Sequence, residues 1–117
     1  MITKVILAAN WHLYIKGNRF DPSAGYASLI QVGSNNTNQV HIFEEQFSKT
    51  IELLLSAKKE IIVLKQPPEL NFDPKSCVTK RGIIFDGQKC HLDAKIVKAY
   101  LDEYQSTLDG LLKRYPQ

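Results

Sequence analysis

The sequence predicts an α/β fold, a parallel sheet flanked by helices in three layers, and two observations carry this prediction. Two short apolar runs, at residues 5–9 and 61–64, are separated by a segment with helical period. The order strand, helix, strand is typical of a right-handed βαβ unit with parallel strands. Two strands are few for a sheet that buries both faces, so we expect this sheet to be incomplete.

The first predicted strand changes character abruptly at its end. The unbroken apolar run from Val5 to Ala9 indicates a strand buried on both faces, and the polar chemistry of Asn10, Trp11 and His12 follows it directly. In open α/β sheets, ligands bind just beyond the carboxyl ends of the strands. We therefore expect functional chemistry at this exit.

The remaining elements follow from period and turn residues. A turn-rich excursion over residues 15–38 precedes an amphipathic helix of about 16 residues that begins at Phe43. The second strand, residues 61–64, leads into a loop that begins with Gln66. Parallel pairing brings this loop close to the polar exit of the first strand. A closing helix is expected from Asp93, a suitable N-cap, to Tyr115.

The bulk composition is that of one domain, or of a fragment of one, over residues 1–117. With 44% hydrophobic residues, a chain of this length can bury roughly two thirds of its unfolded surface without metals or disulfides.

The net charge of +3 comes with no long basic run, which argues against nucleic-acid binding. No apolar run approaches the roughly 20 residues of a bilayer span, so we expect this chain to be soluble. Because no signal peptide is visible, it is either cytoplasmic or part of a larger, separately targeted chain.

Each side chain at the strand exit has a functional and a structural interpretation. The amide of Asn10 can donate to an oxyanion, a contact worth about 3 kcal/mol of barrier, or it can simply cap the strand. Trp11 and Tyr14 could stack on a sugar ring or an acyl group, or pack in the core. His12 is a candidate base by its position, although no acidic residue has an orienting spacing to it.

Two cysteines, Cys77 and Cys90, bracket a second irregular stretch over residues 70–92. Their spacing does not suit a structural zinc site, and we expect neither a metal nor a cofactor. A disulfide between them would brace the stretch by roughly 3 kcal/mol; the alternative is two unrelated thiols. An oxidising compartment favours the disulfide, and the cytoplasm favours the thiols. Ser34 follows a glycine as nucleophiles often do, but it follows no strong strand, so a flexible loop is favoured there.

Four segments also carry a resemblance to a known family: KVILAANWHLY (4–14), FSKTIELLL (47–55), KKEIIVLKQPPELNFDPKSC (58–77) and KAYLDEYQSTLDGLLKRYP (98–116). Together with Cys90 they look like the middle of an SGNH-type hydrolase/acyltransferase domain. More narrowly, they resemble the SGNH domain that follows the membrane-spanning region of bacterial O-acyltransferases modifying surface polysaccharides. The resemblance covers about residues 4–116 and implies an SGNH/flavodoxin-like arrangement of sheet and helices.

The resemblance assigns a role to Asn10. The family uses a Ser in a Gly-Asp-Ser segment and an Asp-x-x-His segment, and neither is present here. Its third block, Gly-x-Asn-Asp, is matched by residues 8–11, in which Ala8 replaces Gly, Trp11 replaces Asp and the Asn is retained. The match implies that Asn10 is an oxyanion-hole donor. We therefore expect the chain to contribute the oxyanion-hole strand and to be inactive alone.

The resemblance also implies the reaction and the location of the parent protein. The parent protein would transfer or hydrolyse an acyl group, expected to be acetyl, between an acyl donor and a carbohydrate acceptor. It would be membrane-bound, with this domain on the extracytoplasmic (periplasmic) side of the bacterial inner membrane, where a Cys77–Cys90 disulfide is favoured. Sheet edges left open by missing strands would promote self-association. The alternative is a non-catalytic α/β module that binds a glycan or a protein partner through the loop at Trp11.

Overall fold

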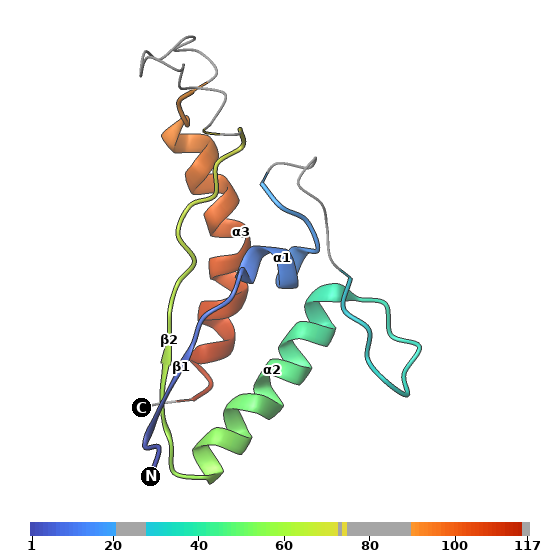
Figure 1. Ribbon diagram of the computed structural model, residues 1–117. Coiled ribbons are helices and arrows are strands. Elements are labelled where there is room, and N and C mark those ends of the chain that lie inside the picture. Colours follow the sequence, from blue (N-terminus) through green and yellow to red (C-terminus); the bar gives the residue numbers. More distant parts are fainter. Residues whose placement is uncertain (21–27, 73, 75–89, 116–117) are drawn as a thin grey trace.

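The computed structural model describes residues 1–20, 28–72, 74 and 90–115. The elements follow in the order β1 (Lys4–Leu7), α1 (Trp11–Lys16), α2 (Gln39–Ser56), β2 (Glu60–Val63) and α3 (Ala94–Leu112) (Figure 1). Within these described residues, no helix has both the length and the apolar character that a bilayer span requires.

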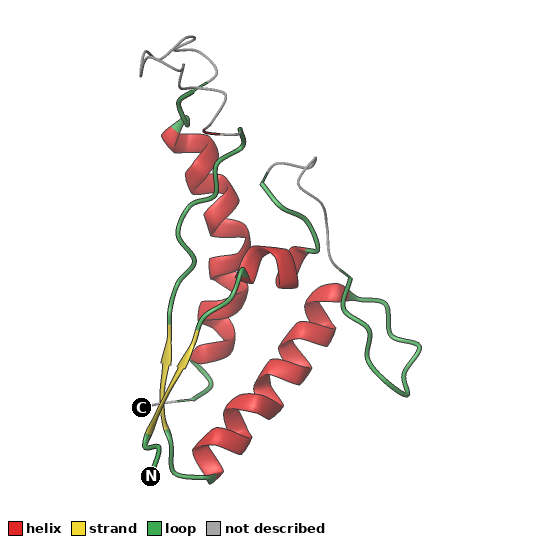
Figure 2. Cartoon of the chain, in the orientation of Figure 1, coloured by secondary structure: helices red, strands yellow, loops and turns green. Residues whose placement is uncertain are grey.

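The two strands pair in parallel, and the connection between them contains α1 and α2 (Figure 2). Lys4 lies opposite Glu60, and Leu7 lies opposite Val63. The first of these pairs also forms an ion pair, with Lys4 Nζ 3.0 Å from Glu60 Oε2. The predicted βαβ unit is confirmed, and a two-stranded sheet with flanking helices is an incomplete α/β arrangement, as expected.

Side chains on the strands alternate between a covered and an uncovered face. Ile61 is 8% exposed, whereas Ile62 beside it is 37% exposed and Ile6 on β1 is 61% exposed. Leu7 and Val63 pack against the helical core, but no described element covers Ile6 and Ile62. The expectation that both faces of the strand are buried is therefore wrong for the described residues. The apolar run also outlasts the strand, because β1 ends at Leu7.

The core lies between the three helices. Its buried members come from α1, α2 and α3: Trp11, Ile15, Phe43, Tyr104, Leu108 and Leu111. The Trp11 ring meets Phe43 and Phe47 edge-on, with centroids 6.3 and 5.4 Å apart. These contacts confirm the amphipathic helix predicted from Phe43, and Tyr104, Leu108 and Leu111 form the buried face of α3. Ile96, in the first turn of α3, is 55% exposed.

Capping side chains set where the helices begin. Helix α2 starts at Gln39 rather than Phe43, because Asn38 Oδ1 accepts from the backbone N–H of His41 at 3.1 Å. Helix α3 begins after Asp93, as predicted. The pattern did not predict α1, since six residues are too few to show a helical period.

Candidate functional site

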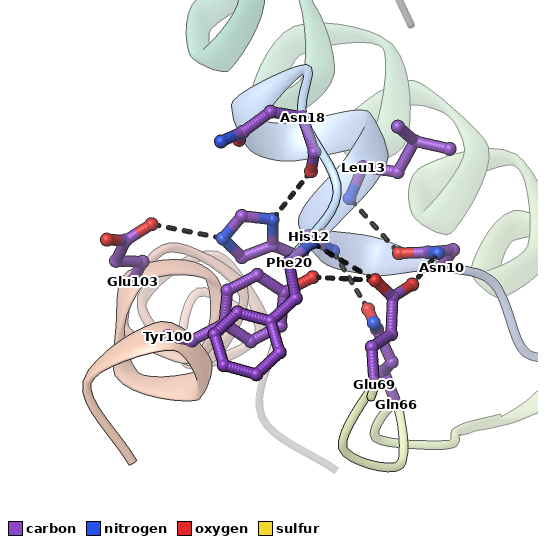
Figure 3. Close-up of polar contacts among 9 residues, drawn as sticks. All are labelled: Asn10, His12, Leu13, Asn18, Phe20, Gln66, Glu69, Tyr100 and Glu103. Atoms are coloured by element: carbon purple, nitrogen blue, oxygen red, sulfur yellow. Dashed lines mark hydrogen bonds and ion pairs between the residues drawn. The ribbon is translucent and has the colours of Figure 1, made fainter. Parts of the chain in front are cut away.

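The candidate site lies where the segments that follow β1 and β2 meet (Figure 3). The backbone N–H of His12 donates to Gln66 Oε1 at 2.9 Å. Nearby, the Asn10 side-chain nitrogen donates to Glu69 Oε1. These contacts confirm the prediction that the polar exit of the first strand lies beside the loop that begins with Gln66. They follow from parallel pairing, which ends both strands at the same edge of the sheet.

Asn10 connects the end of the first strand segment to the start of α1. Its Oδ1 accepts from the backbone N–H of Leu13 at 3.2 Å and so caps the helix. Its Nδ2 donates to Glu69. An amide nitrogen carries two hydrogens, and among the described contacts only one of them is used. The amide is thus held at both ends by described neighbours, and its role in an oxyanion hole stays a prediction.

Glu69 accepts hydrogen bonds from three donors. Reasoning from the sequence did not identify it as a site residue. Its Oε1 accepts from Asn10, and its Oε2 accepts from the Phe20 backbone N–H and the Tyr100 hydroxyl, both at 3.2 Å. Burial raises the pKa of the Tyr100 hydroxyl well above its ordinary value, and the charge of Glu69 raises this pKa further. Tyr100 therefore remains a donor at neutral pH. The sequence signal that could have identified Glu69 as a site residue is its place in the loop just after the second strand.

His12 is fully buried, and both of its ring nitrogens have partners. Nδ1 lies 2.8 Å from the carbonyl oxygen of Asn18, and Nε2 lies 3.0 Å from Glu103 Oε2. Because a carbonyl oxygen can only accept, Nδ1 carries a hydrogen and donates it. The ring also stacks on Tyr100, with centroids 3.8 Å apart. Glu103 is thus an acidic neighbour of His12 that the sequence did not reveal, because 91 residues separate the two. Substrate binding by His12 stays a prediction.

Trp11 and Tyr14 lie in different environments. Trp11 is 4% exposed and donates from Nε1 to the Leu64 carbonyl at 2.6 Å, which favours core packing over stacking on a ligand. Tyr14 is 41% exposed. It borders a hollow of about 250 Å³ whose other walls are Leu29, Phe43, Gln46, Phe47 and Thr50. Substrate binding by either ring stays a prediction.

The remaining candidates lie away from this site. Cys90 is disulfide-bonded, and its predicted partner, Cys77, lies outside the described residues. Ser34 is exposed, and its Oγ accepts from the Asn36 backbone N–H at 3.1 Å, as in a surface turn. No group of three or more His, Cys, Asp or Glu side chains that could hold a metal ion occurs in the described part of the chain.

Comparison with known proteins gives one match. The model of the SGNH domain (fused to AT3 domains) matches residues 1–117. No curated protein and no solved structure matches the chain.

Proposed function

The chain belongs to the family of SGNH domains fused to AT3 domains, and on this premise we propose that it supplies one wall of the acyl-transfer site of a carbohydrate O-acyltransferase or esterase. The family makes it a hydrolase/acyltransferase-type part. The proposal adds that the acyl group is acetyl, that the acceptor is a polysaccharide, and that the domain works on the extracytoplasmic (periplasmic) side of a bacterial inner membrane.

One observation supports this proposal most directly, the fixed amide of Asn10 at the carboxyl edge of the parallel sheet. Oδ1 is held by the Leu13 N–H and Nδ2 by Glu69. The second Nδ2 hydrogen has no partner among the described contacts, and its proposed acceptor is the oxyanion that forms when a serine attacks the acyl carbonyl. The serine and the acid–base pair come from the family's other motifs, which these 117 residues do not contain.

Rigidity is what makes such a donor useful. A hydrogen-bond donor that already points at the developing charge costs no reorganisation when the reaction occurs, and removing one such donor typically lowers the rate by about 10²-fold. The contacts of Asn10 with Leu13 and Glu69 restrict the side chain in this way. A solvated, freely rotating asparagine would contribute less.

The test is acetyl-ester turnover by the full-length gene product that carries this segment. Asn10→Ala is expected to lower kcat by about 10²-fold. Asn38→Ala is the matched control, because Asn38 caps α2 through the same kind of bond, to His41. Each variant loses about 1 kcal/mol of cap stabilisation, but only the Asn10 variant loses the proposed donor. An unchanged kcat in a folded Asn10→Ala protein would contradict the proposal.

The 117-residue chain alone gives a second test. Because it lacks the family's nucleophile and acid–base motifs, we expect no turnover of a chromogenic acetyl ester above buffer. Turnover that a Ser34→Ala change abolishes would instead place the nucleophile within this chain.

A further inference from the structure

Glu69 reaches from the loop after β2 to the side chain of Asn10 (Figure 3). We infer that Glu69 is a positioning residue, which holds the Asn10 amide in the orientation that makes its nitrogen the available donor. This inference rests on the proposed oxyanion role of Asn10. It adds a requirement that the family match does not contain, namely a carboxylate behind the oxyanion-hole amide.

The orientation of the amide follows from its two neighbours. In the observed orientation, Oδ1 accepts from Leu13 and Nδ2 donates to Glu69. A rotation of the amide by half a turn would set its oxygen against the carboxylate and its nitrogen against the Leu13 N–H. Both contacts would then be repulsive, acceptor to acceptor and donor to donor. The carboxylate therefore acts together with the helix N–H to select one orientation.

Glu69 is itself held by groups that only a carboxylate satisfies. Its Oε2 accepts from the Phe20 N–H and the Tyr100 hydroxyl, while its Oε1 accepts from Asn10. Three donors converge on one side chain, so it must accept at both oxygens. A glutamine has a single carbonyl oxygen, which would face the Phe20 N–H and the Tyr100 hydroxyl because two donors meet there. Its NH₂ group would then face the Asn10 nitrogen, so the bond to Asn10 is the one that is lost.

The supports of Glu69 are rigid in turn. The Tyr100 ring lies between the His12 ring, at 3.8 Å, and the Phe20 ring, at 4.5 Å between centroids. The loop that carries Glu69 is pinned at Gln66, which accepts from the His12 N–H at 2.9 Å and, through its carbonyl, from the Tyr104 hydroxyl at 3.3 Å. Helix α3 therefore fixes the carboxylate from one side, and α1 fixes its loop from the other.

A double-mutant cycle in the full-length gene product tests the kinetic consequence. Glu69→Gln is expected to lower kcat by about tenfold with little change in KM, a smaller loss than the about 10²-fold loss of Asn10→Ala. If Glu69 acts through Asn10, it should have no further effect once Asn10 is alanine. Glu52→Gln is the matched control, because Glu52 also accepts from a tyrosine hydroxyl, that of Tyr115, at 3.0 Å.

The side-chain amide of Asn10 gives a readout that does not depend on activity. In ¹H–¹⁵N spectra of the 117-residue chain, its hydrogen that bonds Glu69 should exchange slowly with water. Glu69→Gln should shift this resonance and speed its exchange at least tenfold, whereas Glu52→Gln should leave it unchanged. If Glu69→Gln does not fold, Tyr100→Phe removes one support of the carboxylate and should give a smaller effect in the same direction.

The outcomes separate this inference from the function on which it rests. An unchanged kcat in Asn10→Ala would contradict the proposed function. A loss of activity in Asn10→Ala with none in Glu69→Gln, or losses that multiply in the double variant, would overturn the positioning role alone. An Asn10 amide resonance that is the same in the wild type and in Glu69→Gln would overturn it as well.

Discussion

The Nε2 atom of His12 lies 3.0 Å from Oε2 of Glu103, a contact that joins α1 to α3. The imidazole is buried, whereas the Glu103 side chain is 54% exposed. On its other side the ring donates to the Asn18 carbonyl, and its face stacks on Tyr100. One buried ring thus ties three segments together beside the candidate site.

His12→Ala is expected to lower the free energy of unfolding by about 3 kcal/mol, because it removes a buried ring and strips the Asn18 carbonyl of its donor. Glu103→Gln keeps an acceptor oxygen at a half-exposed position and should cost less than about 1 kcal/mol. Urea unfolding followed by circular dichroism measures both. The exposed His41 supplies the control, since His41→Ala should change the value by at most about 0.5 kcal/mol. A similar loss in His12→Ala and His41→Ala would contradict a structural role for the buried ring.

The alternation along β2 gives a matched pair of substitutions. Ile61 is 8% exposed and Ile62 is 37% exposed, although the residues are chemically identical neighbours. Ile61→Ala should lower the free energy of unfolding by about 3 kcal/mol, and Ile62→Ala by less than about 1 kcal/mol, because only the first leaves a cavity. Equal losses in thermal or urea unfolding would mean that the uncovered face is buried in solution, for instance by self-association.

Just after the end of α2, the backbone of Lys58 is strained, and a substitution at this position can relieve the strain. Lys58 has φ of 55°, and around it the Lys59 N–H donates to the Leu54 carbonyl and the Lys58 N–H donates to the Leu55 carbonyl. This is the Schellman pattern, in which glycine is the preferred left-handed residue. Lys58→Gly should therefore raise the free energy of unfolding by about 0.5 kcal/mol.

The controls for this change use the same position. Lys58→Asn, which tolerates the left-handed region better than lysine does, should give a smaller gain. Lys58→Ala should give none, because alanine keeps the Cβ that causes the strain. A lower melting temperature for Lys58→Gly than for Lys58→Ala would show that chain entropy outweighs strain at this position.

Much of the fold could be predicted because its signals are local. The apolar runs, the amphipathic period of the helix predicted from Phe43 and the cap at Asp93 all lie within short windows of sequence. Parallel pairing then places the exit of the first strand beside the loop that begins with Gln66. The exposed face of Ile6 could not be predicted in this way. In the sequence, an apolar run has the same pattern whether other elements cover one of its faces or both.

The candidate site was predicted only in part, because its contacts join distant segments. Asn10 was found from its position at the end of a strand. Its partner Glu69 is 59 residues away, and Glu103 is 91 residues from His12. No periodicity links such pairs. The sequence leaves both stacking on a ligand and core packing open for Trp11, and the burial of its side chain favours packing.

The raised pKa of Tyr100 predicts a loss of stability at alkaline pH. Burial, followed by the charge of Glu69, raises this pKa above the ordinary value of 10.0. Above about pH 10 the unfolded chain therefore releases the tyrosine proton while the folded chain retains it. The contribution of Tyr100 is fully present below that pH and is lost as the pH rises, by at most about 1.4 kcal/mol per pH unit.

Tyr100→Phe isolates this contribution from the titration of lysines in the same range. At about pH 8 the variant should be less stable than the wild type by about 1 kcal/mol, because Glu69 loses one of its donors. Above about pH 10 the two stabilities should converge, since phenylalanine has no proton to release. Urea unfolding at several pH values measures the difference.

Tyr115→Phe is the matched control, because the Tyr115 hydroxyl also donates to a carboxylate, that of Glu52, but at an exposed position. A difference between Tyr100→Phe and the wild type that stays constant across the range would mean that the Tyr100 hydroxyl ionises as readily in the folded protein as in the unfolded chain.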